Sequence, residues 1–441
     1  MKKGALTGLL LFGMFFGAGN LIFPPALGVL SGENFWPAIL GFVVSGVGIA
    51  VVALIVGTLN PKGYIYEISR KISPSYATIY LVILYLAIGP FFAIPRTATT
   101  SFEVGIVPML GGTNIQLWLL VFTAAYFLAA YLIALNPSKI LDSIGRILTP
   151  VFAILIVILV VLGVGKYGAA SSLPAAETFS ASKALGSGFI EGYNTLDALA
   201  AIAFSVVAVN TLKKLGFSSK KEYLTTIWIV GMIVAIAFSA LYIGLAFLGN
   251  HFPVPADVLA SDTNKGVYVL SQATQAIFGP SAQLFLAVMV VMTCFTTTAG
   301  LIVSSAEFFA DRFPRLPYKV YATVFTLIGF GIANLGLNTI IQFSLPVLLI
   351  LYPITICIVL ITIVNKLLPL SVYGMQLTVG VVTVLAFLEV LAKQFGWEEV
   401  SQLIALLPLA DQSLAWLLPA IIGILLSLFL PNKQVSEAFE M

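Results

Sequence analysis

Polar groups inside long apolar stretches are the residues of this chain best suited to chemistry. The stretch "FGMFFGAGNLIFPPALG" (12–28) is almost wholly apolar, yet its middle holds small residues and an amide: Gly17, Ala18, Gly19 and Asn20. We predict an interrupted helix there, because glycine weakens helices and Pro24 and Pro25 suit the first turn of a new helix beginning near Leu21. The freed amides of such a break can bind a carboxylate, and its freed carbonyls can bind a cation.

A second polar stretch lies within "LGSGFIEGYNTLDALAAIAFSVVAVN" (185–210). Its centre consists of Glu191, Gly192, Tyr193, Asn194 and Thr195, with Asp197 close behind. Asn194 or Thr195 could cap a new helix after it. If Asn194 is the cap, Asp197 falls at the third position, where an acidic side chain is favourable. The sequence therefore predicts a second break. A seam of small residues between packed helices is the plainer interpretation of Gly17 and Gly19, and the second break argues against it.

Three consecutive threonines form a third candidate group. "MTCFTTTAGLIVSSAEFF" (292–309) places Thr296, Thr297 and Thr298 in the middle of an apolar stretch. Hydroxyls in apolar helices usually bond back to their own backbone, and we expect this of at least one of the three. The others could present oxygen atoms to a small hard cation such as Na+.

Charged residues inside apolar stretches are functional hypotheses by default. Arg96 and Glu103 stand seven residues apart, on roughly one helix face, in a helix that Pro90 and Pro95 should kink. A structural ion pair, or a side chain snorkelling to the outer surface, fits this spacing as well as a gate does. Glu307 and Glu389 are interpreted as interface residues. The sequence holds no H-E-x-x-H motif and no His within an apolar stretch, so it gives no support to an enzyme.

Composition identifies the elements that must position these groups. The chain of 441 residues is 60% hydrophobic and 9% charged, whereas soluble domains are about a quarter charged. This composition indicates an integral membrane protein. The apolar runs are long enough to span a bilayer as helices and lack the alternation of membrane strands. We predict twelve helices, over residues 6–30, 36–58, 76–103, 116–135, 141–165, 186–211, 222–248, 281–311, 318–335, 339–364, 372–392 and 413–430.

The basic residues predict the orientation of the chain. With the N-terminus inside, all but five of the 21 Lys and Arg residues fall on the cytoplasmic side, as the positive-inside rule requires. The five exceptions are Arg96, Lys166, Lys183, Lys265 and Lys393. Both termini are therefore expected in the cytoplasm. The net charge of +3 reflects this topology and gives no reason to expect nucleic-acid binding.

The predicted helices divide into two comparable halves. Residues 1–165 contain five spans, an outer loop covers 166–185, and residues 186–364 contain five more; two further spans and a cytoplasmic tail occupy 365–441. An odd number of helices per half inverts the second half relative to the first, a common arrangement in secondary transporters with discontinuous helices. The two predicted breaks fall in the first helix of each half, as this arrangement requires.

Four stretches of the sequence resemble one known family. "FGMFFGAGNLIFPPALG", "GPFFAIPRTATTSFE", "EGYNTLDALAAIAF" and "LPVLLILYP" are similar to signatures of the bacterial branched-chain amino acid:cation symporters, the BrnQ-type carriers. The resemblance covers nearly the whole chain. It implies an all-α membrane protein with the leucine-transporter-like fold, a five-plus-five inverted repeat in which helices 1 and 6 are broken. It also implies uptake of leucine, isoleucine and valine across the bacterial cell membrane, with no obligate protein partner.

The resemblance further implies the locations of the binding sites. The substrate site would use Gly17 to Asn20 and Glu191 to Thr195, with the carboxylate on first-break amides, the ammonium on sixth-helix carbonyls and Tyr193 beside the apolar side chain. The most widely shared sodium site of the superfamily would use the carbonyls of Gly13, Phe16 and Thr293 and the hydroxyls of Thr296 and Thr297. A further sodium site, found in some members, would use Asn20.

The coupling ion is the open question at this stage. Some sodium-independent relatives place a fifth-helix Lys at the sodium position, and "DSIGRILTPVFAILIVILVVLGVG" has no Lys in its middle. Together with the threonine pair, this favours Na+ over H+. Glu191 and Asp197 keep proton coupling as an alternative. An amino-acid-gated channel and a sensor that binds without transport are more distant alternatives.

Overall fold

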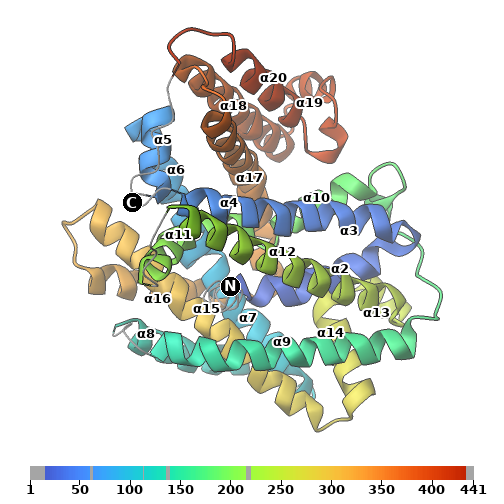
Figure 1. Cartoon of the computed structure of the whole chain (residues 1–441). Helices are drawn as coiled ribbons and strands as arrows, with labels where there is room; N and C mark the ends of the chain where they lie inside the picture. Colours follow the sequence, from blue (N-terminus) through green and yellow to red (C-terminus); the bar gives the residue numbers. More distant parts are fainter. Residues whose placement is uncertain (1–14, 60–62, 113, 136–139, 215–219, 434–441) are drawn as a thin grey trace.

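The computed structural model describes residues 15–59, 63–112, 114–135, 140–214 and 220–433. Within these ranges the chain is helical and forms no β-strand; its one pair of bridged residues is Ser371 and Lys433. The prediction of an all-α protein is therefore confirmed. Figure 1 shows the helices as a single bundle, in which α18, α19 and α20 lie at one edge and pack on the rest through α17.

The first half contains short helices that join into longer runs. Its helices are α2 (Ala18–Ser31), α3 (Phe35–Val43), α4 (Ile49–Thr58), α5 (Gly63–Lys71), α6 (Pro74–Leu86), α7 (Ala93–Ser101), α8 (Ile115–Ala134) and α9 (Ile140–Tyr167). Single π-helical turns link α3 to α4 (Val44–Gly48), link α6 to α7 (Ala87–Phe91) and follow α7 (Phe102–Ile106). Such turns are frequent at functional sites.

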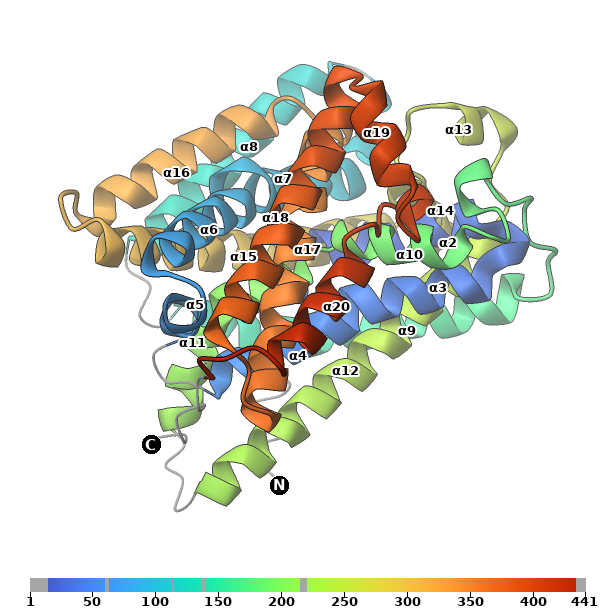
Figure 2. The same cartoon turned by 90° about the horizontal axis from the view of Figure 1, so that it is seen from above.

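The second half and the C-terminal part are built from longer helices. They are α10 (Ala184–Tyr193), α11 (Asp197–Lys214), α12 (Lys220–His251), α13 (Ala256–Ala260), α14 (Lys265–Phe278), α15 (Ala282–Arg312), α16 (Tyr318–Ala333) and α17 (Leu337–Leu367). The chain continues through α18 (Val372–Phe395), α19 (Glu398–Ala405) and α20 (Leu417–Ser427). Figure 2 shows α17, α18 and α20 crossing the bundle side by side.

The number of membrane spans stays a prediction. Among the described residues, seven helical runs are long and apolar enough to cross a membrane, and three shorter apolar helices lie at 153–167, 318–333 and 417–427. The first run, Ala18–Thr58, covers parts of two predicted spans, because a short 3₁₀ turn at Gly32–Asn34 joins them. The span predicted over 186–211 is divided between α10 and α11.

Proline affects the run from α6 to α7 at one of the two expected positions. Pro90 lies within the π turn, where Gly89 has non-helical dihedral angles (φ −86°, ψ −120°), so the predicted kink is present there. Pro95 lies in the first turn of α7, where a missing amide removes no helix hydrogen bond. The kink therefore comes from Pro90 and its neighbours.

Glycines allow the backbones of several helices to touch. A Cβ at Gly28 would lie 1.9 Å from the Ala246 carbonyl oxygen, and one at Gly249 would lie 2.2 Å from that of Pro25. On the other side of α2, a Cβ at Gly266 would lie 1.7 Å from the Ile22 carbonyl oxygen. In lipid, helix association depends on this close packing of small residues. These contacts hold α2 firmly between α12 and α14.

We predict that Gly28→Ala destabilises the protein by about 1–3 kcal/mol, because the added methyl would overlap a backbone carbonyl that has no freedom to turn away. The measurement is the melting temperature of the purified protein in detergent. Gly380→Ala is the matched control, since nothing lies within 4 Å of its Cβ position. Equal melting temperatures for the two variants would contradict the close approach of α2 and α12.

Candidate functional site

The break in the first helix is shorter than predicted. Phe16 and Gly17 are the non-helical residues, and α2 begins at Ala18, with Gly17 extended at φ −135° and ψ −165°. Gly19 and Asn20 therefore belong to the first turn of α2, and the prediction of a helix starting near Leu21 is wrong. The reason is local: Asn20 Oδ1 accepts a hydrogen bond from the Gly17 amide at 2.8 Å and closes that turn early.

The earlier start of α2 also changes the role of its prolines. Pro24 and Pro25 lie beyond the first turn of α2, inside the helix. The prediction that they lie in its first turn is therefore wrong. Since proline has no amide hydrogen, the carbonyls of Asn20 and Leu21 receive no bond from the residue four positions later. The N-terminal amides of α2 still point into the break and carry the positive end of the helix dipole. Gly13, predicted to bind sodium, lies outside the described residues.

The break in the second half separates α10 from α11. Asn194, Thr195 and Leu196 form it, with tight-turn hydrogen bonds of 3.0–3.2 Å from their amides to Glu191, Gly192 and Tyr193. Leu196 has a left-handed backbone (φ 65°) and precedes the first residue of α11, Asp197. The predicted cap at Asn194 is therefore wrong, because the turn runs on for two residues. Asp197 still lies at the positive end of a helix dipole, where its charge is favourable.

The two breaks meet at Gly19. A Cβ at this position would lie 3.1 Å from the Thr195 carbonyl oxygen and 3.0 Å from Arg96 Nη2. A side chain at Gly19 would therefore force Arg96 or the Thr195 backbone to shift by a few tenths of an ångström. The structure thus brings together residues from both predicted substrate stretches, which are about 175 residues apart in the sequence.

Arg96 joins this centre and does not lie near the surface. Its side chain is 3% exposed; Nη1 donates to the Asn194 carbonyl at 2.6 Å, and Nη2 contacts the Thr195 carbonyl at 3.4 Å. Among the described residues no ion pair joins Arg96 to Glu103. Glu103 lies in the π turn Phe102–Ile106, whose extra residue rotates it away from the face predicted for an α-helix.

A buried carboxylate lies on the other side of α2. Asn20 Nδ2 donates to both oxygens of Asp197, at 2.9 and 3.1 Å, and the Tyr242 hydroxyl donates to Asp197 Oδ2 at 2.5 Å. The Asn20 amide also contacts the Tyr242 hydroxyl. These bonds connect α2, α11 and α12. Sequence reasoning missed Tyr242, for which a hydroxyl within the apolar run of α12 was the available signal.

The predicted sodium ligands that the structure describes lie together. Thr297 Oγ1 donates to the carbonyls of Phe16 and Thr293, each at 3.3 Å, and Thr296 Oγ1 lies 2.8 Å from the Thr293 carbonyl. This cluster offers oxygen atoms alone, the ligand type that a small hard cation prefers. Thr298 bonds back to Cys294 and contacts Thr97 and Tyr126, so the prediction that at least one threonine bonds to its own helix is confirmed.

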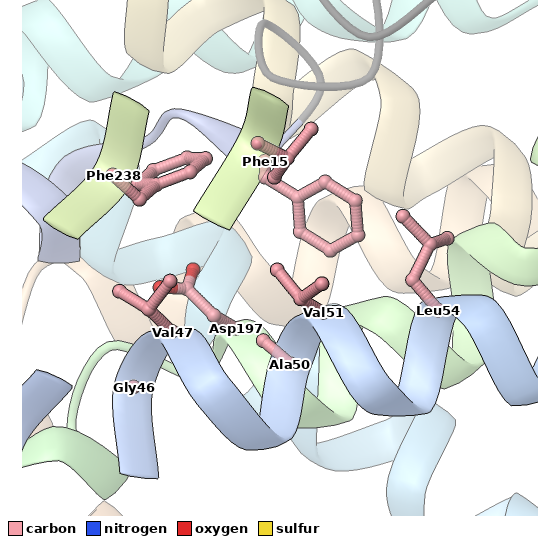
Figure 3. Close-up of a pocket in the computed structure, with 9 residues that line it drawn as sticks. Phe15, Gly46, Val47, Ala50, Val51, Leu54, Asp197 and Phe238 are labelled. Carbon is pink, nitrogen blue, oxygen red and sulfur yellow. The ribbon is translucent and has the colours of Figure 1, made fainter. Parts of the chain in front are cut away.

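The cavity beside the first break is almost entirely apolar (Figure 3). It is small, with about 10 Å³ of room for a water-sized molecule, and Asp197 supplies its acidic group. The lining residues are Phe15, Gly46, Val47, Ala50, Val51, Leu54, Asp197, Val234 and Phe238. Tyr193 is not among them: it is buried and stacked on Tyr352, with ring centroids 4.1 Å apart. Glu191 is half-buried near the end of α10.

Comparison with solved structures identifies the fold. The nucleobase-cation-symport-1 family transporter Mhp1, in a closed conformation, aligns over 99% of this chain and 94% of its own, with a TM-score of 0.59 and 17% identity. MhsT in complex with L-phenylalanine aligns over 96% of this chain and 97% of its own, with a TM-score of 0.55 and 15% identity. The fold is therefore that of the leucine-transporter-like membrane transporters.

Sequence comparison gives the family. A family model described as branched-chain amino acid transport protein matches residues 1–434. A putative branched-chain amino acid carrier protein from Staphylococcus saprophyticus is 42% identical over 96% of this chain and 94% of its own length. One from Staphylococcus aureus (strain USA300) is 41% identical over 98% of both. The chain belongs to the branched-chain amino acid transport protein family, as its motifs predicted, and is a multi-pass membrane transporter and not an enzyme.

We predict that Tyr242→Phe lowers the free energy of unfolding by about 1.5–3 kcal/mol, because Asp197 Oδ2 would lose a hydrogen bond to its charge in a buried site. Thermal unfolding of the purified protein measures this effect. Tyr373→Phe is the control, since Tyr373 is 61% exposed. If both variants melted like the wild type, the carboxylate would not depend on the hydroxyl.

Proposed function

We propose that this protein imports leucine, isoleucine and valine together with Na+ by alternating access. The observation that carries the proposal is the meeting of two helix breaks at Gly19 and Thr195, with amides exposed by one break and carbonyls by the other. The proposed repeats are residues 1–165 and 186–364, and the proposed orientation has both termini in the cytoplasm of a bacterial cell. A lipid bilayer and a small-molecule substrate are the partners this role requires.

The two ends of an amino acid match the two breaks. In our proposal the substrate carboxylate binds the N-terminal amides of α2, where helix dipole and free donors act together. The ammonium group binds carbonyl oxygens at the C-terminal end of α10, where the dipole has the opposite sign. Discrimination between aliphatic side chains that differ by one methylene is worth only about 1–3 kcal/mol. We therefore expect leucine, isoleucine and valine to compete for one site.

The oxygen cluster beside the first break suits the coupling ion. The proposed sodium ligands are the carbonyls of Gly13, Phe16 and Thr293 and the hydroxyls of Thr296 and Thr297. The hydroxyls now donate to carbonyls, and rotation of each O–H about its Cβ–Oγ1 bond would turn a lone pair toward an ion. Phe16 is bonded to Gly17, so an ion that holds the Phe16 carbonyl also fixes the start of α2. Ion and substrate would then favour each other's binding by the same factor.

Proton coupling is the second candidate, and Asp197 is the observation in its favour. This buried carboxylate bonds to Asn20 and to Tyr242, which belong to different helices. A proton on Asp197 would remove a negative charge and one acceptor from this junction, and would so loosen α2 from α12. In this alternative the threonine cluster is a packing feature.

Uptake into proteoliposomes discriminates between these functions. With labelled leucine outside, we expect accumulation above the external concentration when a Na+ gradient is imposed, and competition by unlabelled isoleucine and valine. Accumulation driven by a pH gradient alone would support the proton alternative. Saturable binding without accumulation would indicate a sensor, and an amino-acid-gated current without saturating uptake would indicate a channel.

The paired substitution Thr296→Val and Thr297→Val tests the proposed sodium site. We expect the Na+ concentration for half-maximal uptake to rise about tenfold or more, because two oxygen ligands are replaced by methyl groups of similar size. Thr226→Val is the control: Thr226 bonds back to Glu222 on an exposed part of α12. An unchanged Na+ requirement in the paired variant would exclude this cluster as the ion site.

A further inference from the structure

Arg96 lies at the point where the two breaks meet. One of its nitrogen atoms, Nη1, makes a short bond of 2.6 Å to the Asn194 carbonyl. The guanidinium also lies over the Phe23 ring, 5.2 Å from the centroid, which fixes its plane. The guanidinium is therefore a buried positive charge in a fixed position, and the side chain does not extend to the membrane surface.

One edge of this guanidinium is left largely unused. Nε is buried and has no hydrogen-bond partner among the described residues, and Nη2 has only the 3.4 Å contact with the Thr195 carbonyl. Nε and Nη2 share one edge, whose two N–H groups are parallel and match the two oxygens of a carboxylate. A charged donor buried without an acceptor is costly, so this edge suits an anion that arrives from outside.

The unused edge faces the start of α2. Nη2 lies 3.0 Å from the Cβ position at Gly19, and the Thr195 carbonyl oxygen lies 3.1 Å from it. Gly19, in the first turn of α2, therefore lies in close contact with a cationic donor and a carbonyl acceptor. Close by, Asn194 Oδ1 is a second buried acceptor that has no partner in the described part of the chain.

We propose that Arg96 binds the carboxylate of the transported amino acid through Nε and Nη2. Nη1 stays on the Asn194 carbonyl, and the substrate's ammonium group takes the Thr195 carbonyl. This inference rests on the proposed function. It adds that Arg96 determines specificity for the carboxylate: the site binds α-amino acids with a free carboxylate and rejects those in which that group is an amide. Gly19 is required because a side chain at this position would press on both Nη2 and the Thr195 carbonyl.

The test compares the binding of leucine and leucinamide to the purified full chain, by displacement of labelled valine. Leucinamide keeps the side chain and the amino group but has a neutral amide in place of the carboxylate. For the wild type we expect leucine to bind at least tenfold more tightly than leucinamide. In Arg96→Gln, leucine should weaken about tenfold to a hundredfold and leucinamide should change little, so that the ratio falls toward one.

A purely structural role for Arg96, as a cap on the carbonyls of α10, gives a different result. Both ligands would weaken together and the ratio would be retained, which would overturn the inference. Arg96→Lys keeps the charge and one donor, so it should fold like the wild type while recovering only part of the preference for leucine. If Arg96→Gln does not fold, the ratio measured with Arg96→Lys decides, and a wild-type ratio there overturns the proposal.

Gly19→Ala supplies an independent check. Its methyl would lie 3.0 Å from Nη2 and 3.1 Å from the Thr195 carbonyl oxygen and would displace both, so leucine binding should fall at least tenfold. Gly300→Ala on α15, with nothing within 4 Å of its Cβ position, should bind like the wild type. Tight leucine binding by Gly19→Ala would overturn the location of the site. If the wild type binds none of the three branched-chain amino acids, the proposed function itself fails, and this inference fails with it.

Discussion

The centre of this protein depends on one constraint, which is that a backbone amide or carbonyl surrounded by lipid and apolar side chains must find a partner. Each unpaired group costs several kcal/mol, so a helix can be interrupted inside a membrane only where polar groups meet the break. Both breaks obey this rule. Asn20 accepts from the Gly17 amide, Thr297 donates to the Phe16 carbonyl and Arg96 donates to the Asn194 carbonyl. Each of these partners also lies where a ligand atom is proposed to bind.

The same constraint links the two ligands mechanically. The proposed ion cluster and the proposed carboxylate subsite are on consecutive residues, Phe16 and Gly17, so one cannot be ordered without affecting the other. Beyond the first turn, α2 is packed against α12 and α14 through Gly28, Gly249 and Gly266, at distances that leave no room for sliding. We therefore expect α2, α12 and α14 to move together when the transporter changes its accessible side, with the breaks acting as the hinges.

Much of the fold could be predicted from the sequence, because apolar runs of membrane length carry a strong signal. The positions of both breaks followed from Gly17, Gly19 and the polar stretch after Glu191. Their precise ends did not, because a hydrogen bond from the Gly17 amide to Asn20 and a left-handed Leu196 decide where α2 and α11 begin. Residue preferences for helix or loop do not predict such individual contacts.

The partners of the charged residues were the least predictable part of the site. The spacing of Arg96 and Glu103 suggested a pair, but α7 ends at Ser101 and Glu103 lies in the π turn that follows it. Nothing in the sequence around Tyr242 indicates its partner, which is Asp197, 45 residues away in the chain. Contacts of this kind depend on how distant helices pack, and the sequence of one helix does not contain that information.

The most direct test of the central claim is hydrogen–deuterium exchange measured by mass spectrometry at constant Na+, with and without leucine. If the substrate binds between the two breaks, peptides that cover residues 15–20 and those that cover 193–197 should both exchange more slowly when leucine is present. The exchange rates of backbone amides in the middle of α12 and α15 should change little when leucine is added. Saturating leucine that leaves both segments unaffected, or that protects only a region elsewhere in the bundle, would contradict the account.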